Sequence, residues 1–541
     1  MTQPQNPNSV PLIFSAPLPS GSGARALGLA GAFTAVADDA TAASWNPAGL
    51  TQLERPELSI VYRYSHERDL RSIGDSDYHV GEDDFDANNI NYMSAVMPFR
   101  LFDRNMVVSL NYQEVFDFSQ YYHANYIESG SEDRPISAYT DPENPLDPNK
   151  ALRREIPVTP ATFPFNPDPP NTFYTITPHL YIQRTYDTKE TVTHTSANDV
   201  QFEQEGSVQA ITPAFAFDLT PKLSLGAALN VYQAGLLNTP NIHSKTRARY
   251  AGSLDRTVGI TKILYGSYVD AKGKWNGNDI DLIDLFDKSW EEIPTGPEAS
   301  EVTHYTYSGL YEVEQRISQY RGLNATLGSL LTVSEQLTLG FNLDLPWKAH
   351  ARQTTTARSE FEMWDSNGVS LGKFPGTSQT SKDVEFEYPL YWALGSVWRW
   401  NNRLSTSFDV SQTWWSDYSF KEEGGTRKNP LDGSDHGEHP LDDCWSLRTG
   451  TEYLWVLKRT EIPLRGGLSW EQRPAIGKPD DYWGISLGTG ISIGKGPNKV
   501  IIDIAYTYTW ANSVMGSLVP DKDIGSDVQR HDVYVSCIYH F

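Results

Sequence analysis

Two five-residue patterns near the C-terminal end have a spacing that could support nucleophilic chemistry. Gly484–Gly488 (GISLG) and Gly490–Gly494 (GISIG) match G-x-S-x-G, in which a serine stands at a sharp turn between a strand and a helix. Here the glycines and serines share the even positions, and bulky apolar residues occupy most odd positions. A single strand with one small face explains both patterns. The sequence therefore predicts neither a catalytic serine nor an enzyme.

The segment DHGEHP is a candidate metal site, because two acidic residues and two histidines fall within five positions: Asp435, His436, Glu438 and His439. Imidazole and carboxylate groups at this spacing could hold a divalent ion. A solvated acidic loop is the simpler interpretation, so we expect no metal and no other cofactor. The formal charge of −24 argues against nucleic acid as a partner, because proteins that bind nucleic acid present basic surfaces.

The hydrophobic pattern has a period of two, which indicates strands. In Lys499–Trp510 (KVIIDIAYTYTW) one face carries apolar and aromatic residues, and the other carries mostly small and polar residues. The segments 222–231 and 336–345 repeat this alternation. The mean hydropathy is −0.47, and no apolar run approaches the ~18 residues of a membrane helix. We expect an all-β protein.

The connections between these strands alternate between short turns and long polar loops, as in outer-membrane barrels. The longest loops are 117–205 and 234–318; within the second, 281–293 has the apolar spacing of a short helix. We predict a closed, monomeric, 14-stranded antiparallel transmembrane β-barrel over residues 56–541. Its strands are expected near 57–65, 89–99, 105–116, 206–218, 222–233, 319–332, 336–345, 384–400, 403–416, 443–456, 463–471, 482–494, 499–510 and 529–541.

The first 55 residues differ from this pattern, because Gly23–Leu50 (GARALGLAGAFTAVADDATAASWNPAGL) is rich in alanine and glycine. A lumen of 14 strands is wide enough to leak unless it is filled. Small residues allow a backbone to approach the barrel wall closely, and Asn46-Pro47 gives a rigid turn before the first strand. We predict that residues 1–55 form an N-terminal hatch that plugs the lumen. Its motif residues are Asp38, Asp39, Asn46, Pro47 and Ala48.

The C-terminal end also indicates an outer-membrane barrel of a Gram-negative bacterium. In HDVYVSCIYHF the odd positions from Val533 to Phe541 form an apolar face that ends on an aromatic residue, which resembles the insertion signal of bacterial barrels. The first residues, MTQPQNPNSV, lack the basic and apolar regions of a secretory signal peptide. We therefore expect a mature chain whose signal peptide has been removed.

Several segments resemble the FadL/TodX family of outer-membrane transporters of long-chain fatty acids and aromatic hydrocarbons. They are the hatch sequence, 384–418 (VEFEYPLYWALGSVWRWNNRLSTSFDVSQTWWSDY), 462–474 (IPLRGGLSWEQRP) and DDYWGISLGTGISIG. The resemblance implies passive uptake of hydrophobic small molecules, with release through hatch movement and a lateral opening in the barrel wall. It also implies contact with outer-membrane lipid and lipopolysaccharide. The enlarged loops leave an alternative, in which the barrel is a structural or protein-secretion partner without small-molecule transport.

The family's third strand carries a glycine-containing kink, whereas the matching stretch here, 110–118 (LNYQEVFDF), has no glycine. Strict alternation would place Glu114 on the lipid face, where a charge is unfavourable. Either the strand has left the bilayer by Glu114, or a bulge turns the side chain inward. We predict an irregularity between Asn111 and Phe116. The residues of this lateral-opening strand are Asn111, Gln113, Glu114 and Phe116.

Alternation also points Arg465 and Arg448 into the lumen, where a ligand carboxylate could pair with them. The alternative is a pair of structural salt bridges within the lumen, to Glu452, Glu471 or Asp409. Trp392 and Phe33 supply the aromatic side chains of the predicted ligand set.

Overall fold

The computed structural model describes residues 18–19, 21–73, 79–139, 154–157, 161–164, 173–238, 241–275, 278–281, 289–293, 300–422, 424–431, 433–457, 460–475, 477–495, 498–515 and 524–541. Among them, fourteen strands pair antiparallel in a ring that closes where β2 meets β25. These strands are β2 (Glu57–Ile73), β3 (His79–Leu101), β4 (Arg104–Asp117), β9 (Ser207–Thr220), β10 (Leu223–Ala234), β14 (Ser300–Thr332), β15 (Leu337–Asp344), β18 (Tyr391–Asn401), β19 (Leu404–Thr413), β21 (Cys444–Val456), β22 (Glu461–Arg473), β23 (Asp480–Lys495), β24 (Asn498–Met515) and β25 (Ile524–His540). The predicted barrel is confirmed.

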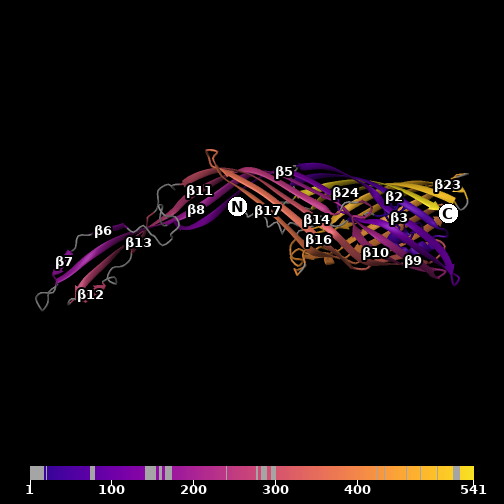
Figure 1. Ribbon diagram of the computed structural model, residues 1–541, viewed down its shortest axis with the longest axis horizontal. Coiled ribbons are helices and arrows are strands. Elements are labelled where there is room, and N and C mark those ends of the chain that lie inside the picture. The colour runs from indigo at the N-terminus through magenta and orange to yellow at the C-terminus, as the bar shows by residue number, and fades with distance from the viewer. Residues whose placement is uncertain are drawn as a thin grey trace.

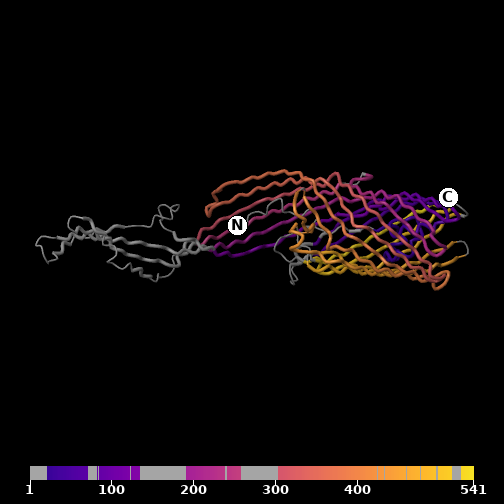
Figure 2. Tube along the Cα trace, turned by 90° about the horizontal axis from the view of Figure 1, so that it is seen from below, coloured from indigo at the N-terminus to yellow at the C-terminus, as the bar shows by residue number. Residues whose placement is uncertain are grey.

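An extension of the barrel sheet, which we call the arm, continues one side of the barrel away from the end that holds the C-terminus (Figures 1 and 2). Its strands pair in the order β5–β8–β11–β14–β16–β17–β20, so β14 belongs to both the barrel and the arm. The arm strands are β5 (Gln120–Tyr139), β8 (Phe173–Glu205), β11 (His243–Trp275), β16 (Trp347–Trp364), β17 (Ser370–Tyr388) and β20 (Ser419–Glu422), with β6 (Arg154–Pro157), β7 (Ala161–Pro164), β12 (Asn278–Asp281) and β13 (Ser289–Ile293) added.

The arm corrects the expectation of long loops over 117–205 and 234–318, since most described residues of both segments are strands. The helix predicted over 281–293 is wrong at its described ends, because Asp281 belongs to β12 and Ser289–Ile293 is strand β13; residues 282–288 lie outside the described part. At Gln319 β14 bends into the arm. The residue has a positive φ of 56°, and the register with β16 shifts between Ser318 and Arg321.

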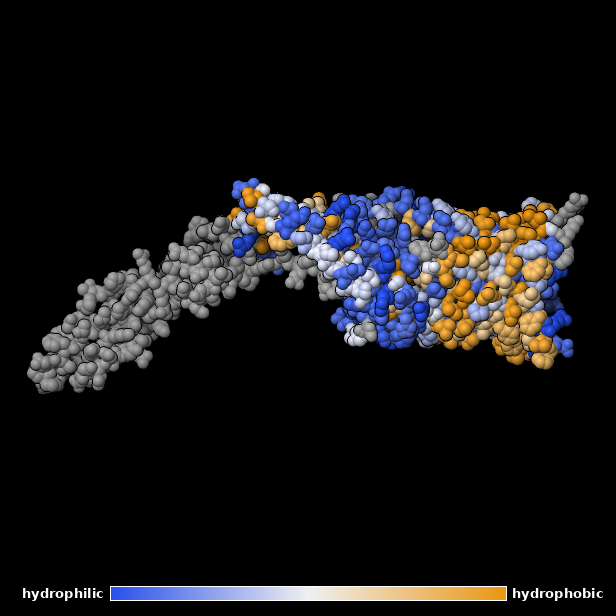
Figure 3. All heavy atoms as spheres, in the orientation of Figure 1, coloured by the Kyte–Doolittle hydropathy of each residue, from blue (hydrophilic) through white to orange (hydrophobic). Residues whose placement is uncertain are grey.

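The outer face of the barrel carries a hydrophobic belt around the end that holds the short turns and the C-terminus (Figure 3). Its members are large exposed apolar residues on alternate positions, such as Leu323 and Leu327 of β14 and Leu394 of β18. This belt suits the hydrocarbon core of a membrane, and polar residues take over beyond it. Among the described helices, none is long and apolar enough to cross a membrane.

Inside the barrel lies the N-terminal segment, which contains only short elements. They are β1 (Leu18–Pro19), α1 (Ala24–Gly28), α2 (Ala42–Trp45) and η2 (Pro47–Gln52); the other short helices, η3 (Leu236–Asn238) and η5 (Trp415–Asp417), follow barrel strands. Most residues from Ser22 to Leu53 are buried. Small side chains let this segment pack against the inner wall with its backbone.

Candidate functional site

The inner wall of the barrel carries glycines where the N-terminal segment touches it. A Cβ built on Gly450 would lie 2.7 Å from Leu29 Cβ, and one on Gly395 would lie 2.8 Å from Thr34 Cβ. No ordinary side chain fits at these distances, so glycine permits the close approach. The glycines with such contacts are Gly226, Gly328, Gly340, Gly395, Gly450, Gly467 and Gly488.

Hydrogen bonds fix the N-terminal segment to the wall at its motif residues. Asn46 is buried; its side chain accepts a hydrogen bond from the Ala48 backbone and donates to the carbonyl oxygens of Thr34 and Ser329. Pro47 and Ala48 lie against Gly226 of β10. Asn46 therefore ties the turn before the first barrel strand to the barrel strand β14.

The acidic pair of this segment serves two different contacts. Asp38 accepts a 2.6 Å hydrogen bond from Arg25, which also reaches Glu452 of β21 at 3.1 Å. Asp39 accepts hydrogen bonds from the backbone and the hydroxyl of Thr41. Asp38 thus contributes to an ionic link with the wall, and Asp39 shapes the segment itself.

The backbone ladder between β3 and β4 is interrupted. Their ladder ends at the pair Tyr92–Gln113, although β4 continues to Asp117. On the other side of β4, the register with β9 shifts between Glu114 and Phe116. The irregularity predicted between Asn111 and Phe116 is therefore present, without a glycine.

Beyond the last β3–β4 pair, the N-terminal strand β1 pairs with β4. Leu18 pairs with Asp117 and Pro19 with Phe116. This contact is only two residues long, and β1 directly precedes the segment that fills the lumen. The C-terminal end of β4 is thus covered by β1, and β1 can detach without any loss of pairing between barrel strands.

Charged side chains gather beside this break, on the lumen side. Arg63 lies 3.3 Å from each of Glu114, Asp117 and Asp532, and its exposed fraction is 1%. Arg530 contacts Asp532 at 3.2 Å and Glu67 at 3.7 Å. These contacts join two arginines to four carboxylates, so the surroundings of the break carry an excess of negative charge.

An aromatic cluster fills the junction of barrel and arm. Trp347 stacks between Tyr232 and Tyr388, at centroid distances of 3.9 and 4.2 Å. Tyr388 also stacks on Phe116 of β4 at 5.5 Å and contacts Tyr418 at 5.3 Å. Tyr232 lies six residues after Gly226 on β10, so the cluster is ~20 Å further along the barrel than the point where the N-terminal segment touches Gly226. Apolar ring surface therefore runs from the junction to the wall break.

The sequence matches the family described as outer membrane protein transport protein (OMPP1/FadL/TodX) over residues 176–530, more than half of the chain. The chain belongs to this family. It is an outer-membrane β-barrel of the kind found in Gram-negative bacteria. No curated protein matches the chain.

Solved structures of FadL-family channels resemble this one. A FadL homologue of Pseudomonas aeruginosa has a TM-score of 0.52 at 14% identity, with 97% of this chain and 100% of the other covered. The toluene transporter TodX of P. putida gives 0.44 at 12% identity, covering 96% and 99%. The toluene transporter TbuX of Ralstonia pickettii gives 0.42 at 14%, covering 96% and 98%. At this identity the likeness to the first structure concerns the fold.

In this FadL-family barrel both predicted lumen arginines already have carboxylate partners. Arg465 lies 2.6 Å from Glu452 and 2.6 Å from Asp503, and Arg448 lies 2.9 Å from Glu471. Their positions fit the structural alternative of salt bridges within the lumen. Both arginines also pack against the N-terminal segment, near Gly28 and Gly31 respectively.

The two aromatic members of the predicted ligand set lie apart from these arginines. Phe33 is fully buried in the N-terminal segment, edge-on to Trp45 at 6.1 Å. Trp392 shares the outer face of β18 with Leu394 and contacts the exposed Trp445. Trp392 therefore faces away from the lumen, and the structure does not bring the four residues together.

The serine pattern that suggested nucleophilic chemistry has a structural role. Ser486 lies inside strand β23, where its hydroxyl donates to the carbonyl oxygen of Gly28 at 3.2 Å. In the described part of the chain, no three His, Cys, Asp or Glu residues are close enough to hold a metal. The sequence analysis missed the aromatic cluster; its one signal was the crowding of rings around Tyr388 in EFEYPLYW.

Proposed function

We propose that this protein is a passive channel that carries hydrophobic molecules across the outer membrane. In this proposal a ligand enters along the aromatic cluster, the N-terminal segment acts as a hatch, and the ligand leaves through the break between β3 and β4. The end of the β3–β4 ladder at Gln113, with β1 lying against the exposed edge of β4, supports the proposal most strongly. A lateral exit keeps an apolar ligand in contact with apolar surface; exposure to water would cost about 25 cal/mol per Å².

The excess of carboxylates beside the break favours neutral hydrocarbons over fatty acids. Each uncompensated carboxylate would repel a ligand carboxylate by about 3 kcal/mol at about 6 Å and an effective dielectric of about 20. Four carboxylates stand against Arg63 and Arg530, so carboxylates outnumber arginines beside the break. We therefore expect toluene to pass more readily than oleate.

The arm raises the alternative function of a partner for other proteins, because a free sheet edge can add a strand. From Ser370 to Asp383, β17 pairs with β16 and with no other described strand. Lys373 and Pro375 stand on this edge, and both residue types discourage strand addition. We therefore place transport first.

A reversible lock tests the exit. In a background without Cys444 and Cys537, Leu18→Cys with Asp117→Cys would join β1 to β4, since paired strands bring Cα atoms within disulfide range. We expect oxidation to lower uptake of labelled toluene at least tenfold in cells, and reductant to restore it. The control pair, Ser492→Cys with Ile501→Cys, bridges the intact β23–β24 ladder and should have no effect. Unchanged uptake in the fully oxidised β1–β4 lock would refute the lateral exit.

A further inference from the structure

A row of charged residues crosses the outer face where the barrel meets the arm. Arg321 of β14 stands opposite His350 of β16, His350 opposite Glu385 of β17, and Glu385 opposite Lys421 of β20. Directly opposite residues of antiparallel strands have Cβ atoms about 5 Å apart. Arg352 and Asp383 lie in the next row, and together these residues line a hollow of about 520 Å³.

This hollow lies at the upper edge of the hydrophobic belt. On the same strand and the same face as Arg321, Leu323 is 57% exposed and Leu327 is 43% exposed. Two residues along a strand span ~7 Å. The polar layer on each side of the hydrocarbon core is also roughly 5–7 Å thick. Arg321 therefore stands at the level of the lipid head groups, and the bend of β14 at Gln319 forms the hollow there.

The hollow leaves one arginine for an anion, although Asp383, Glu385 and Glu422 also line it; Glu422 is paired with Lys382 at 2.8 Å. Arg321 makes no ion pair among the described residues, and Arg352 pairs with the exposed Asp383 at 2.9 Å. Glu385 is shared between Lys348 at 2.7 Å, Lys421 at 3.2 Å and His350 at 3.4 Å. Lys421 and His350 therefore share one carboxylate with Lys348, which also contacts Glu387 at 2.7 Å, so both have capacity for a second acceptor.

We propose that this hollow binds the phosphorylated head group of an outer-leaflet glycolipid of the lipid A type. Arg321 and Arg352 contact the phosphate, since a guanidinium presents two parallel N–H groups to its oxygens. Lys421 and His350 also line the hollow, and the acyl chains lie along the belt at Leu323 and Leu327. The site depends on the protein's place in the outer membrane and does not require the proposed transport function.

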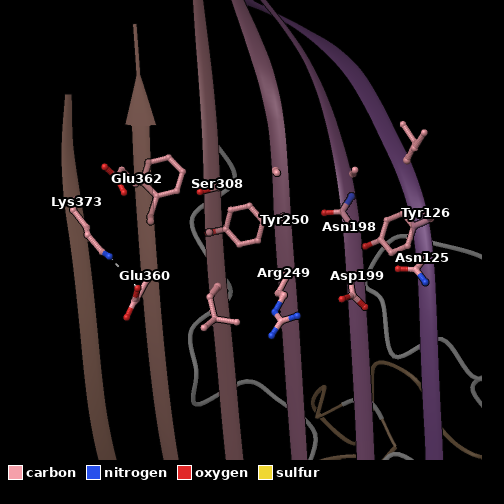
Figure 4. Close-up of a pocket in the computed structure, with 16 residues that line it drawn as sticks. Asn125, Tyr126, Asn198, Asp199, Arg249, Tyr250, Ser308, Glu360, Glu362 and Lys373 are labelled. Carbon is pink, nitrogen blue, oxygen red and sulfur yellow. Dashed lines mark ion pairs between the residues drawn. The ribbon is translucent and has the colours of Figure 1, made fainter. Parts of the chain in front are cut away.

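Binding of bisphosphorylated lipid A to the full chain in a neutral detergent tests the site, with native mass spectrometry as the readout. We expect Arg321→Gln with Arg352→Gln to weaken binding at least tenfold. The matched control is Arg358→Gln with Lys373→Gln, which removes the same charge higher on the arm, where Lys373 pairs with Glu360 (Figure 4). We expect this control to bind like the unchanged protein.

A variant that is expected to tighten binding separates a loss of binding from damage to the fold. Glu385→Gln removes the competing carboxylate, so we expect it to tighten lipid A binding about threefold, which a misfolded arm would not do. Equal binding by the Arg321/Arg352 variant and its control would overturn the site. So would equal binding of dephosphorylated lipid A, or equally tight binding of inorganic pyrophosphate, which would indicate a simple anion site.

Discussion

The glycines of the inner wall allow a direct test of how the N-terminal segment is held. Gly450→Ala would place a methyl group 2.7 Å from Leu29 Cβ, where contacts normally begin at about 3.5 Å. The segment must therefore retreat by roughly 0.8 Å at this point. Overpacking of this kind costs about 1–3 kcal/mol.

This cost applies to the docked segment and not to one that has left the wall. If undocking is the main way to relieve it, the ratio of undocked to docked protein rises by a factor of about 5 to 150. We expect more frequent large openings when single barrels are recorded in a planar bilayer. A chain without residues 1–55 defines the fully open conductance.

Gly466→Ala is the matched control, because Gly466 neighbours Gly467 on β22 but its added Cβ would meet Ser486 O at 3.7 Å and Leu487 at 3.9 Å. Both are ordinary contacts, so this variant should conduct like the unchanged protein. Equal opening frequencies for the Gly450 and Gly466 variants would refute the close-packing argument. A barrel that stays closed after loss of residues 1–55 would refute the plug itself.

Two further predictions concern ion pairs. Arg465→Ala should destabilise the barrel by about 3–5 kcal/mol in urea unfolding, because it leaves the buried Asp503 without its arginine, whereas Glu452 keeps its contact with Arg25; adding Asp503→Asn should recover part of this loss. The hydrogen bond from Lys348, in the arm, lowers the pKa of Glu385 below its usual 4.5. The stabilisation of the arm by ionised Glu385 is therefore complete above pH 4.5 and is lost as the pH falls through the lowered pKa. Amide hydrogen exchange in β16 and β17, corrected for intrinsic rates, should therefore become faster only in acid. An exchange profile unchanged by Glu385→Gln would contradict this.

The barrel could be predicted from the sequence because only one face of each barrel strand meets lipid. In β24 the exposed Ile502, Ile504 and Tyr506 alternate with the buried Asp503 and Ala505, which is the pattern that period-two analysis detects. In the arm the contrast is weaker, because polar residues such as Gln353 and Thr355 also occupy buried positions of β16. Its strands are joined by cross-strand pairs, such as Arg247 with Glu312 at 2.7 Å. The sequence pattern of the arm therefore predicts loops instead of strands.

The placement of Trp392 shows how an interruption between two strands changes the face on which the following side chains lie. Val384, Phe386 and Tyr388 are buried on the inner side of β17. A continuous strand, as predicted over 384–400, would have kept Trp392 on that side. Instead β17 ends at Tyr388 and β18 begins at Tyr391, so Trp392 faces outward and Ala393 inward. Pro389, which cannot donate to a ladder, stands in the gap.

Glu114 shows how an irregularity can follow from one charged residue. On a regular β4 it would follow the exposed Val108 and Leu110 onto the lipid face, where a charge is unfavourable. In the structure its exposed fraction is 0%, and it reaches Arg63 at 3.3 Å while Asn89 donates to it at 2.7 Å. Turning the side chain inward requires the strand to leave regular alternation, and the register shift lies at this point. The unfavourable position of Glu114 in lipid therefore accounts for a distortion of β4 that needs no glycine.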